Sequence, residues 1–142
     1  MIDFIKENEW SIIKEGFDAK HVLASESIFS IGNGKFGQRA NFEEDFSGEH
    51  LYGNYISGIY YPDRTKVGWW KKGYPNYFAK TVNCPVWNAL RIEVNGEILD
   101  LNQCKNVLQF SRELNMKEGW YKRVSKVELQ NRTQLQITST RF

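Results

Sequence analysis

The chain has 142 residues, of which 41% are hydrophobic and 25% are charged, a composition typical of one globular domain rather than a disordered segment. The net charge is +2 and the basic residues are scattered, which argues against nucleic-acid binding and against binding to anionic membranes. No run of residues approaches a membrane span, and residues 1–6 do not resemble a signal peptide, so we expect a cytoplasmic protein.

The first part of the chain shows little helical periodicity. Residues 2–17 are ambiguous between a short helix and an opening strand, whereas residues 22–31 are expected to be extended. Residues 51–60 are rich in aromatic side chains and are interrupted by Gly53 and Gly58, which predicts bulges or a close approach of the backbone.

A glycine-rich turn separates these segments. Gly32, Gly34 and Gly37 spell G-x-G-x-x-G, which in dinucleotide-binding proteins lies between a strand and a helix. Here acidic residues follow Gly37 without an apolar helical stripe, and no acidic residue closes a second strand about 20 residues later. We therefore interpret the pattern as a tight turn between β-strands, with Asn33 as a left-handed turn residue.

Residues 61–80 predict a long loop, because two prolines and two glycines break any regular element. Its many Trp and Tyr residues argue against disorder, and loops of this length usually have a function. The candidate residues for a surface that faces a sugar or another protein are Trp69, Trp70, Lys71, Lys72, Tyr74, Asn76 and Tyr77. A protein interface is the favoured interpretation, because a lone domain rarely exposes so large an apolar patch.

The second half of the chain predicts a series of strands. Leu90, Ile92 and Val94 alternate with charged residues, and Asn95-Gly96 after them indicates a hairpin. Further strands are expected over residues 98–101, 107–114, 120–129 and 134–142, with turns at 116–119 and 131–132. The residues that share one face of the strand 120–129 are Tyr121, Arg123, Ser125, Val127 and Leu129. This pattern predicts an all-β, antiparallel β-sandwich, in which Trp87 packs in the core.

The four cysteine and histidine residues form no zinc-ligand pattern. Cys84 and Cys104 are far apart in the sequence, and His21 and His50 lie far from both. We expect reduced core thiols rather than a disulfide, and neither a metal nor a cofactor.

Several blocks together resemble glycoside hydrolase family 65, which contains maltose, kojibiose and trehalose phosphorylases. These blocks are residues 26–44, 52–60, 83–88 and 112–120. The resemblance implies a β-sandwich related to galactose mutarotase-like domains, with a strand near residues 10–14. It also implies a catalytic (α/α)6 barrel that residues 1–142 lack. Because the last predicted strand ends without a cap or polar tail, we expect a fragment that is incomplete at its C-terminus.

The block 26–44 supplies the candidate structural residues, which are Glu26, Gly32, Asn33, Gly34, Gly37, Arg39, Glu43 and Glu44. We expect Arg39 and one of the acids to form a structural ion pair. Glu43 and Glu44, as neighbours on a strand, would point to opposite faces and could not flank one glycosidic bond. No residue here is given a catalytic role, and inorganic phosphate, the co-substrate, is expected to bind outside this chain.

The resemblance thus implies the non-catalytic N-terminal domain of a phosphorylase that acts on an α-linked glucose disaccharide such as maltose or kojibiose. In that role residues 1–142 would support the catalytic barrel and contribute to a homodimer, and alone they would have no activity. Three alternatives stay open at this point: the same domain of a related glycoside hydrolase, a stand-alone module that binds an α-glucoside, and a domain that only mediates assembly.

Overall fold

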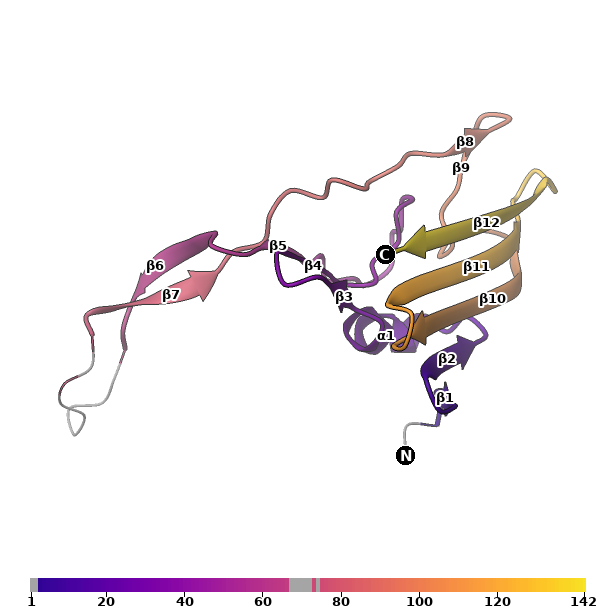
Figure 1. The fold of residues 1–142 in the computed structure, drawn as a ribbon. Helices are drawn as coiled ribbons and strands as arrows, with labels where there is room; N and C mark the ends of the chain where they lie inside the picture. The colour runs from indigo at the N-terminus through magenta and orange to yellow at the C-terminus, as the bar shows by residue number, and fades with distance from the viewer. Residues whose placement is uncertain (1–2, 67–72, 74) are drawn as a thin grey trace.

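A five-stranded antiparallel sheet forms the body of the domain in the computed structural model, which describes residues 3–66, 73 and 75–142 (Figure 1). The order β1-β2-β10-β11-β12 places an N-terminal hairpin beside three long strands from the end of the chain. These strands are β1 (Lys6–Glu7), β2 (Ser11–Glu15), β10 (Asn106–Asn115), β11 (Trp120–Glu128) and β12 (Gln134–Arg141). The predicted all-β antiparallel class and the three long strands are confirmed.

Alternation along β11 decides which face of the main sheet is inside. The five residues predicted to share one face, at alternate positions from Tyr121 to Leu129, are all buried. Tight turns join the long strands, at residues 116–119 and around Arg132, whose φ is 67°. The alternation of residues along this strand in the sequence therefore identifies the face of the sheet that is buried.

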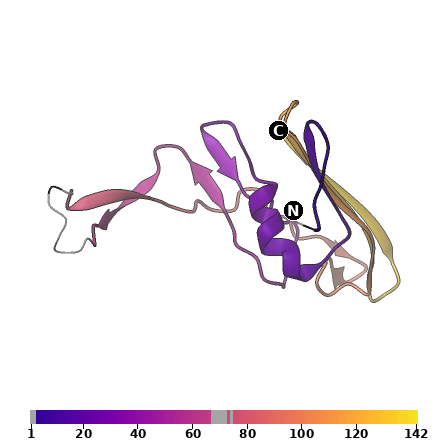
Figure 2. The same ribbon diagram turned by 90° about the horizontal axis from the view of Figure 1, so that it is seen from below.

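Three small sheets and one helical segment complete the described chain. The strands are β3 (Ile31–Gly32), β4 (Phe36–Gln38), β5 (Asn54–Ile56), β6 (Tyr60–Arg64), β7 (Tyr77–Thr81), β8 (Glu93–Val94) and β9 (Glu97–Ile98). The helices are η1 (Ala19–His21) and α1 (Val22–Ile28). Figure 2 shows α1 beside the inner face of the main sheet, with β6 and β7 extending away from the body.

The extended conformation predicted for residues 22–31 is wrong, because Val22–Ile28 form α1. The buried face of the helix consists of Val22, Ser25 and Glu26, at helical spacing. Two of these three residues are polar, so the sequence lacks the apolar stripe that normally identifies a helix. The Asp18 side chain accepts a hydrogen bond from the backbone of Lys20 and starts the helical segment.

The long loop predicted over residues 61–80 is shorter than expected. Its two ends pair as the antiparallel hairpin β6–β7, in register from Tyr60 opposite Thr81 to Arg64 opposite Tyr77. Pro62 is compatible with this pairing because both strands of a two-stranded sheet are edges.

Two expectations about the region before β8 are also wrong. Trp87 is 49% exposed rather than in the core, and Leu90 is 57% exposed rather than half-buried in a strand. Only Glu93–Val94 pair here, with Glu97–Ile98. The predicted hairpin at Asn95-Gly96 is confirmed, since both residues have positive φ, 53° and 79°.

Both cysteines are free thiols and only partly buried. Burial raises the pKa of the Cys104 thiol, and the nearby Asp100 carboxylate adds to this. Among the described residues, no cluster of His, Cys, Asp or Glu is placed to hold a metal ion. Nor does that part of the chain contain a helix long and apolar enough to cross a membrane.

The buried apolar side chains form two clusters on the inner face. The larger contains Val22, Phe42, Phe46, Leu99, Leu101, Phe110, Val127 and Leu129. The smaller contains Phe29, Ala40 and Tyr121. On β11, Arg123 and Ser125 lie between Tyr121 of the smaller cluster and Val127 of the larger one, so a polar layer separates the two clusters.

Leu99 lies in the larger cluster and is fully buried. We expect Leu99→Ala to lower the free energy of unfolding by roughly 2–5 kcal/mol, because the lost methyl groups leave a cavity. Leu108, which is 45% exposed, supplies the matched control, and Leu108→Ala should cost less than about 1 kcal/mol. Urea unfolding of both variants tests this, and equal losses would contradict the assignment of the core.

Candidate functional site

Three basic side chains lie side by side across the inner face of the main sheet. Lys14 is opposite Arg112 in the β2–β10 pairing, and Arg112 is opposite Arg123 in the β10–β11 pairing. Each is at most 2% exposed. Like charges directly opposite each other destabilise a sheet, and buried charges require partners. The sheet therefore needs negative charge from another part of the chain.

Glu43 and Glu44 supply this charge. The two terminal nitrogens of Arg123 donate to the carboxylate of Glu44 over 2.5 Å each, a two-pronged pairing. The Nη2 nitrogen of Arg123 also donates to Glu43 over 2.9 Å. The side chains of Arg123 and Glu44 are both 1% exposed, so this ion pair is closed to solvent.

Arg141 extends the network to the end of β12. Its Nε donates to Glu43 over 2.8 Å, its Nη2 contacts the same carboxylate, and its Nη1 donates to the carbonyl of Arg39 over 2.8 Å. Ser139 donates to Glu43 as well, over 2.7 Å. Glu43 thus joins β11 and β12 to the segment that follows β4.

These partners set the charge states of the network. Burial by itself raises the pKa of the Glu43 carboxyl, but the guanidinium groups of Arg123 and Arg141 outweigh burial and hold its pKa below the ordinary value of 4.5. For Arg123 burial by itself lowers the pKa, but the adjacent Glu44 carboxylate outweighs burial and raises the pKa of Arg123 above its ordinary value. The Glu43 carboxyl and the Arg123 guanidinium are therefore ionised at neutral pH.

Arg112 has a different environment. It donates to the carbonyl of Ala40 over 3.0 Å, and its guanidinium lies over the rings of Phe42 and Phe110, at 4.8 and 5.5 Å from their centroids. Burial lowers its pKa. Glu26 lies nearby and ties α1 to the following loop, because its carboxylate accepts from Leu51 over 2.9 Å.

The ion pair predicted for Arg39 is wrong. The Arg39 guanidinium donates to the carbonyl of Leu23 over 3.2 Å, while the acids pair with Arg123 and Arg141. The expectation that Glu43 and Glu44 point to opposite faces is also wrong. They lie in a bend rather than in a strand, so both reach Arg123.

The glycine-rich turn is confirmed as a hairpin, in which β3 pairs with β4. Gly34 is its left-handed residue, with φ of 81°. Asn33, predicted in that role, instead accepts hydrogen bonds through Oδ1 from the backbone of Lys35 and Phe36. A Cβ on Gly32 would lie 2.9 Å from the carbonyl oxygen of Phe36, so this position requires glycine.

The sequence-predicted surface residues are only partly placed. The candidates that lie outside the described residues are Trp69, Trp70, Lys71, Lys72 and Tyr74. Tyr77, in β7, is 60% exposed, and the carbonyl of Asn76 accepts from Thr65 over 2.9 Å.

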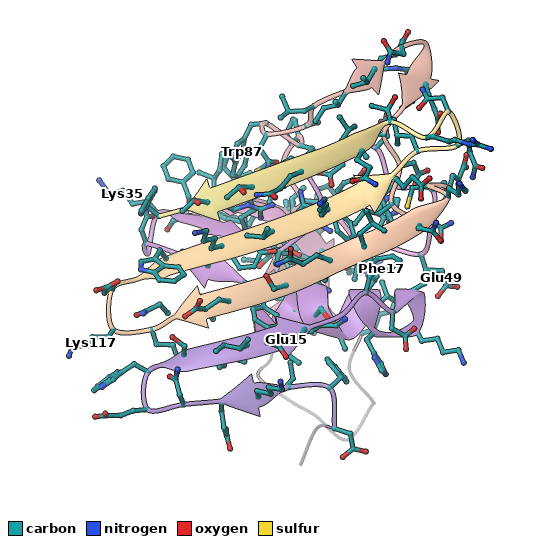
Figure 3. The ribbon with its side chains drawn as sticks, turned by 90° about the vertical axis from the view of Figure 1, so that its right-hand side faces the viewer. Glu15, Phe17, Lys35, Glu49, Trp87 and Lys117 are labelled. Atoms are coloured by element: carbon teal, nitrogen blue, oxygen red, sulfur yellow. The ribbon has the colours of Figure 1, made fainter. Side chains whose placement is uncertain are left out.

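A pocket of about 380 Å³ lies between the β3–β4 hairpin, Trp87 and the end of β12. Phe36 and Trp87 meet edge to face on one side of it, with ring centroids 6.1 Å apart. Figure 3 shows Trp87 and Lys35 together at this end of the main sheet. The pocket is not predictable from the sequence. Its lining comes from three separate segments, and no spacing rule connects them.

These features define an all-β antiparallel domain in which a glycine-rich segment supplies the counter-charges of the main sheet. Residues 12–142 match the family model described as glycosyl hydrolase family 65, N-terminal domain. The chain therefore belongs to glycosyl hydrolase family 65.

Individual relatives agree with this assignment. The maltose phosphorylase of Bacillus subtilis (strain 168) is 44% identical over 95% of this chain and 18% of its own length. A kojibiose phosphorylase of Thermoanaerobacter brockii is 30% identical over 82% of this chain and 13% of its own length. A solved structure, a putative kojibiose phosphorylase from human microbiome, superposes with a TM-score of 0.83 at 31% identity, over 98% of this chain and 18% of its own. The predicted sandwich is confirmed by this similarity, and the chain spans less than a fifth of the length of these relatives.

Glu43→Gln is expected to lower the free energy of unfolding at pH 7 by about 1–3 kcal/mol, because buried guanidinium groups lose a charged partner. The pKa of Glu43 is lowered in the folded state, so its contribution is present above pH 4.5 and is lost as the pH falls below that value. The difference in the free energy of unfolding between Glu43→Gln and the natural protein should therefore decrease as the pH falls below 4.5. Glu49→Gln, at an exposed position, is the control and should show no such trend. A pH-independent difference for Glu43→Gln would contradict the ion pairs.

Lys14 gives the opposite pH dependence. Burial, with a contribution from the neighbouring Arg112, lowers the pKa of Lys14 from 10.5 to about 8. As the pH rises, the folded state therefore loses the Lys14 proton before the unfolded state does. Burial of the charged Lys14 destabilises the folded state below pH 8, and this destabilisation disappears as the pH approaches 10.5. We expect Lys14→Met to be more stable than the natural protein at pH 7, with a difference that decreases between pH 8 and 10. Lys20→Met, at an exposed position, should give a difference that stays constant over this range.

Proposed function

We propose that this chain is the non-catalytic N-terminal domain of a phosphorylase that cleaves an α-linked glucose disaccharide with inorganic phosphate. The observation that carries this proposal is the family match over residues 12–142, in a chain that spans less than a fifth of its phosphorylase relatives. The remainder of such an enzyme would hold the catalytic barrel and the phosphate site.

The state of the buried carboxylates supports a non-catalytic role. A general acid for glycoside cleavage must reach the glycosidic oxygen and keep its proton near neutral pH. Glu44 is closed to solvent and paired with Arg123, and the pKa of Glu43 is lowered rather than raised. These acids hold the sheet to the segment that follows β4, which is a structural task.

The β6–β7 hairpin supports a role in contacts with the barrel or with a second subunit. It projects from the body (Figures 1 and 2). Four of its aromatic side chains are 47–61% exposed. These are Tyr60, Tyr61, Tyr77 and Phe78. An isolated two-stranded hairpin is at best marginally stable in water, so a covering partner would stabilise it. Exposed aromatic residues are typical of such interfaces.

The reaction proposed for the whole enzyme needs one carboxylic acid and one bound phosphate. Phosphate attacks the anomeric carbon, the bond to the leaving oxygen breaks, and the acid protonates that oxygen. The present domain would shape one wall of the cleft. A cytoplasmic location, a homodimer and a galactose mutarotase-like sandwich belong to the same proposal.

The proposal predicts a native protein several times larger than the 16.7 kDa of this chain. An antibody against residues 1–142 would measure this mass in the source cells, and a band at 16.7 kDa would overturn the proposal. The large protein, once purified, should release a sugar phosphate from maltose or kojibiose only when inorganic phosphate is present. Cleavage without phosphate would instead assign a hydrolase.

A further inference from the structure

We propose that the pocket between the β3–β4 hairpin, Trp87 and the end of β12 binds a neutral saccharide through one pyranose unit. This inference extends the proposed function by giving the domain its own saccharide site. Its chemistry rests on the residues that line the pocket.

The pocket has the size and the aromatic wall that such a ligand requires. Its volume of about 380 Å³ lies in the range of small-molecule sites. Trp87 is 49% and Phe36 is 50% exposed, and their rings meet at an interplanar angle of 78°. The edge-to-face contact fixes the indole of Trp87 while half of its surface stays open. An aromatic surface of this kind suits the apolar C–H face of a pyranose ring.

Two amide side chains supply directional polar contacts beside the aromatic wall. Oδ1 of Asn33 is held by two backbone N–H groups of the turn, which fixes the side chain and leaves its Nδ2 to donate. Nε2 of Gln38 donates to Asn54 over 2.9 Å, which leaves the Gln38 Oε1 to accept. Within the described chain no other hydrogen bond engages Asn33 Nδ2 or Gln38 Oε1. A fixed donor and a fixed acceptor are what sugar hydroxyls need.

The charge of the pocket favours a neutral ligand over an anion. Among the described residues that line the pocket, Arg141 is the one basic side chain, and its guanidinium is already occupied by Glu43 and by the carbonyls of Arg39 and Asn41. Its charge is therefore compensated within the protein. A phosphate would find no unpaired cation in this wall, whereas an uncharged sugar needs none.

Indole NMR of the full 142-residue chain tests the site directly. With ¹⁵N labelling, the five Trp side chains give separate Nε1–H signals, and Trp87→Phe assigns the signal of Trp87. We expect maltose and glucose to shift the Trp87 signal with saturation, and the signal of Trp10, which is 46% exposed, to stay in place. Sorbitol, which has hydroxyls but no ring face, should shift neither. Equal shifts of Trp87 and Trp10, or no shift of Trp87, would overturn the proposal.

A conservative variant tests the polar contacts without removing the turn. Asn33→Asp keeps the oxygen that accepts from Lys35 and Phe36 but loses the Nδ2 donor, so maltose should bind about five- to tenfold more weakly. Trp87→Ala should abolish saturable binding, while Trp10→Ala should leave it unchanged. Unchanged maltose affinity in Asn33→Asp and Trp87→Ala, with the natural unfolding midpoint, would also overturn the proposal.

The two proposals fail separately. A large native protein with phosphate-dependent cleavage, in which Trp87 does not respond to maltose, keeps the proposed function and rejects the pocket. A saturable Trp87 response in a protein without phosphorolysis keeps the pocket and rejects the phosphorylase.

Discussion

The pairing of Arg123 with Glu43 and Glu44 is the interaction on which the rest of the structure depends. The main sheet places three basic side chains in a row on its inner face, with Arg123 beside Arg112 and Arg112 beside Lys14. Removal of one partner from a buried ion pair is strongly destabilising, because it leaves an uncompensated charge in the interior. Glu43 and Glu44 thus decide whether Arg123 can be buried on this face.

The same pairing explains why the glycine-rich segment packs against strands that come much later in the chain. The β3–β4 hairpin reverses the chain, and the segment after β4 then crosses the inner face and delivers its two acids. Phe42, between the hairpin and the acids, lies beneath the guanidinium groups of Arg112 and Arg123 and belongs to the larger apolar cluster. One short segment therefore provides both the counter-charge and part of the core.

The sequence predicts well the strands in which buried and exposed residues alternate. It predicts poorly the features that depend on contacts between residues far apart in the chain. Alternation in β11, with turns on both sides, identifies the buried face, including Arg123. The helix α1 escapes prediction because its buried face carries Ser25 and Glu26. The partner of Glu43 cannot be deduced from its neighbours, since Arg39 is closer in sequence but Arg141 makes the contact. The pocket at Trp87 escapes for the same reason, because only the fold joins its segments.

The ion pairs of the inner face connect residues that are 79 to 98 positions apart. During synthesis from the N-terminus, Glu43 and Glu44 leave the ribosome long before Arg123 and Arg141 exist. Until then these acids have only water as a partner, and the apolar rings beside them have no sheet to cover. Contacts of such long range slow folding, because the loop entropy is lost before the contact forms. The domain therefore assembles late, when β11 and β12 close over a segment that was made first.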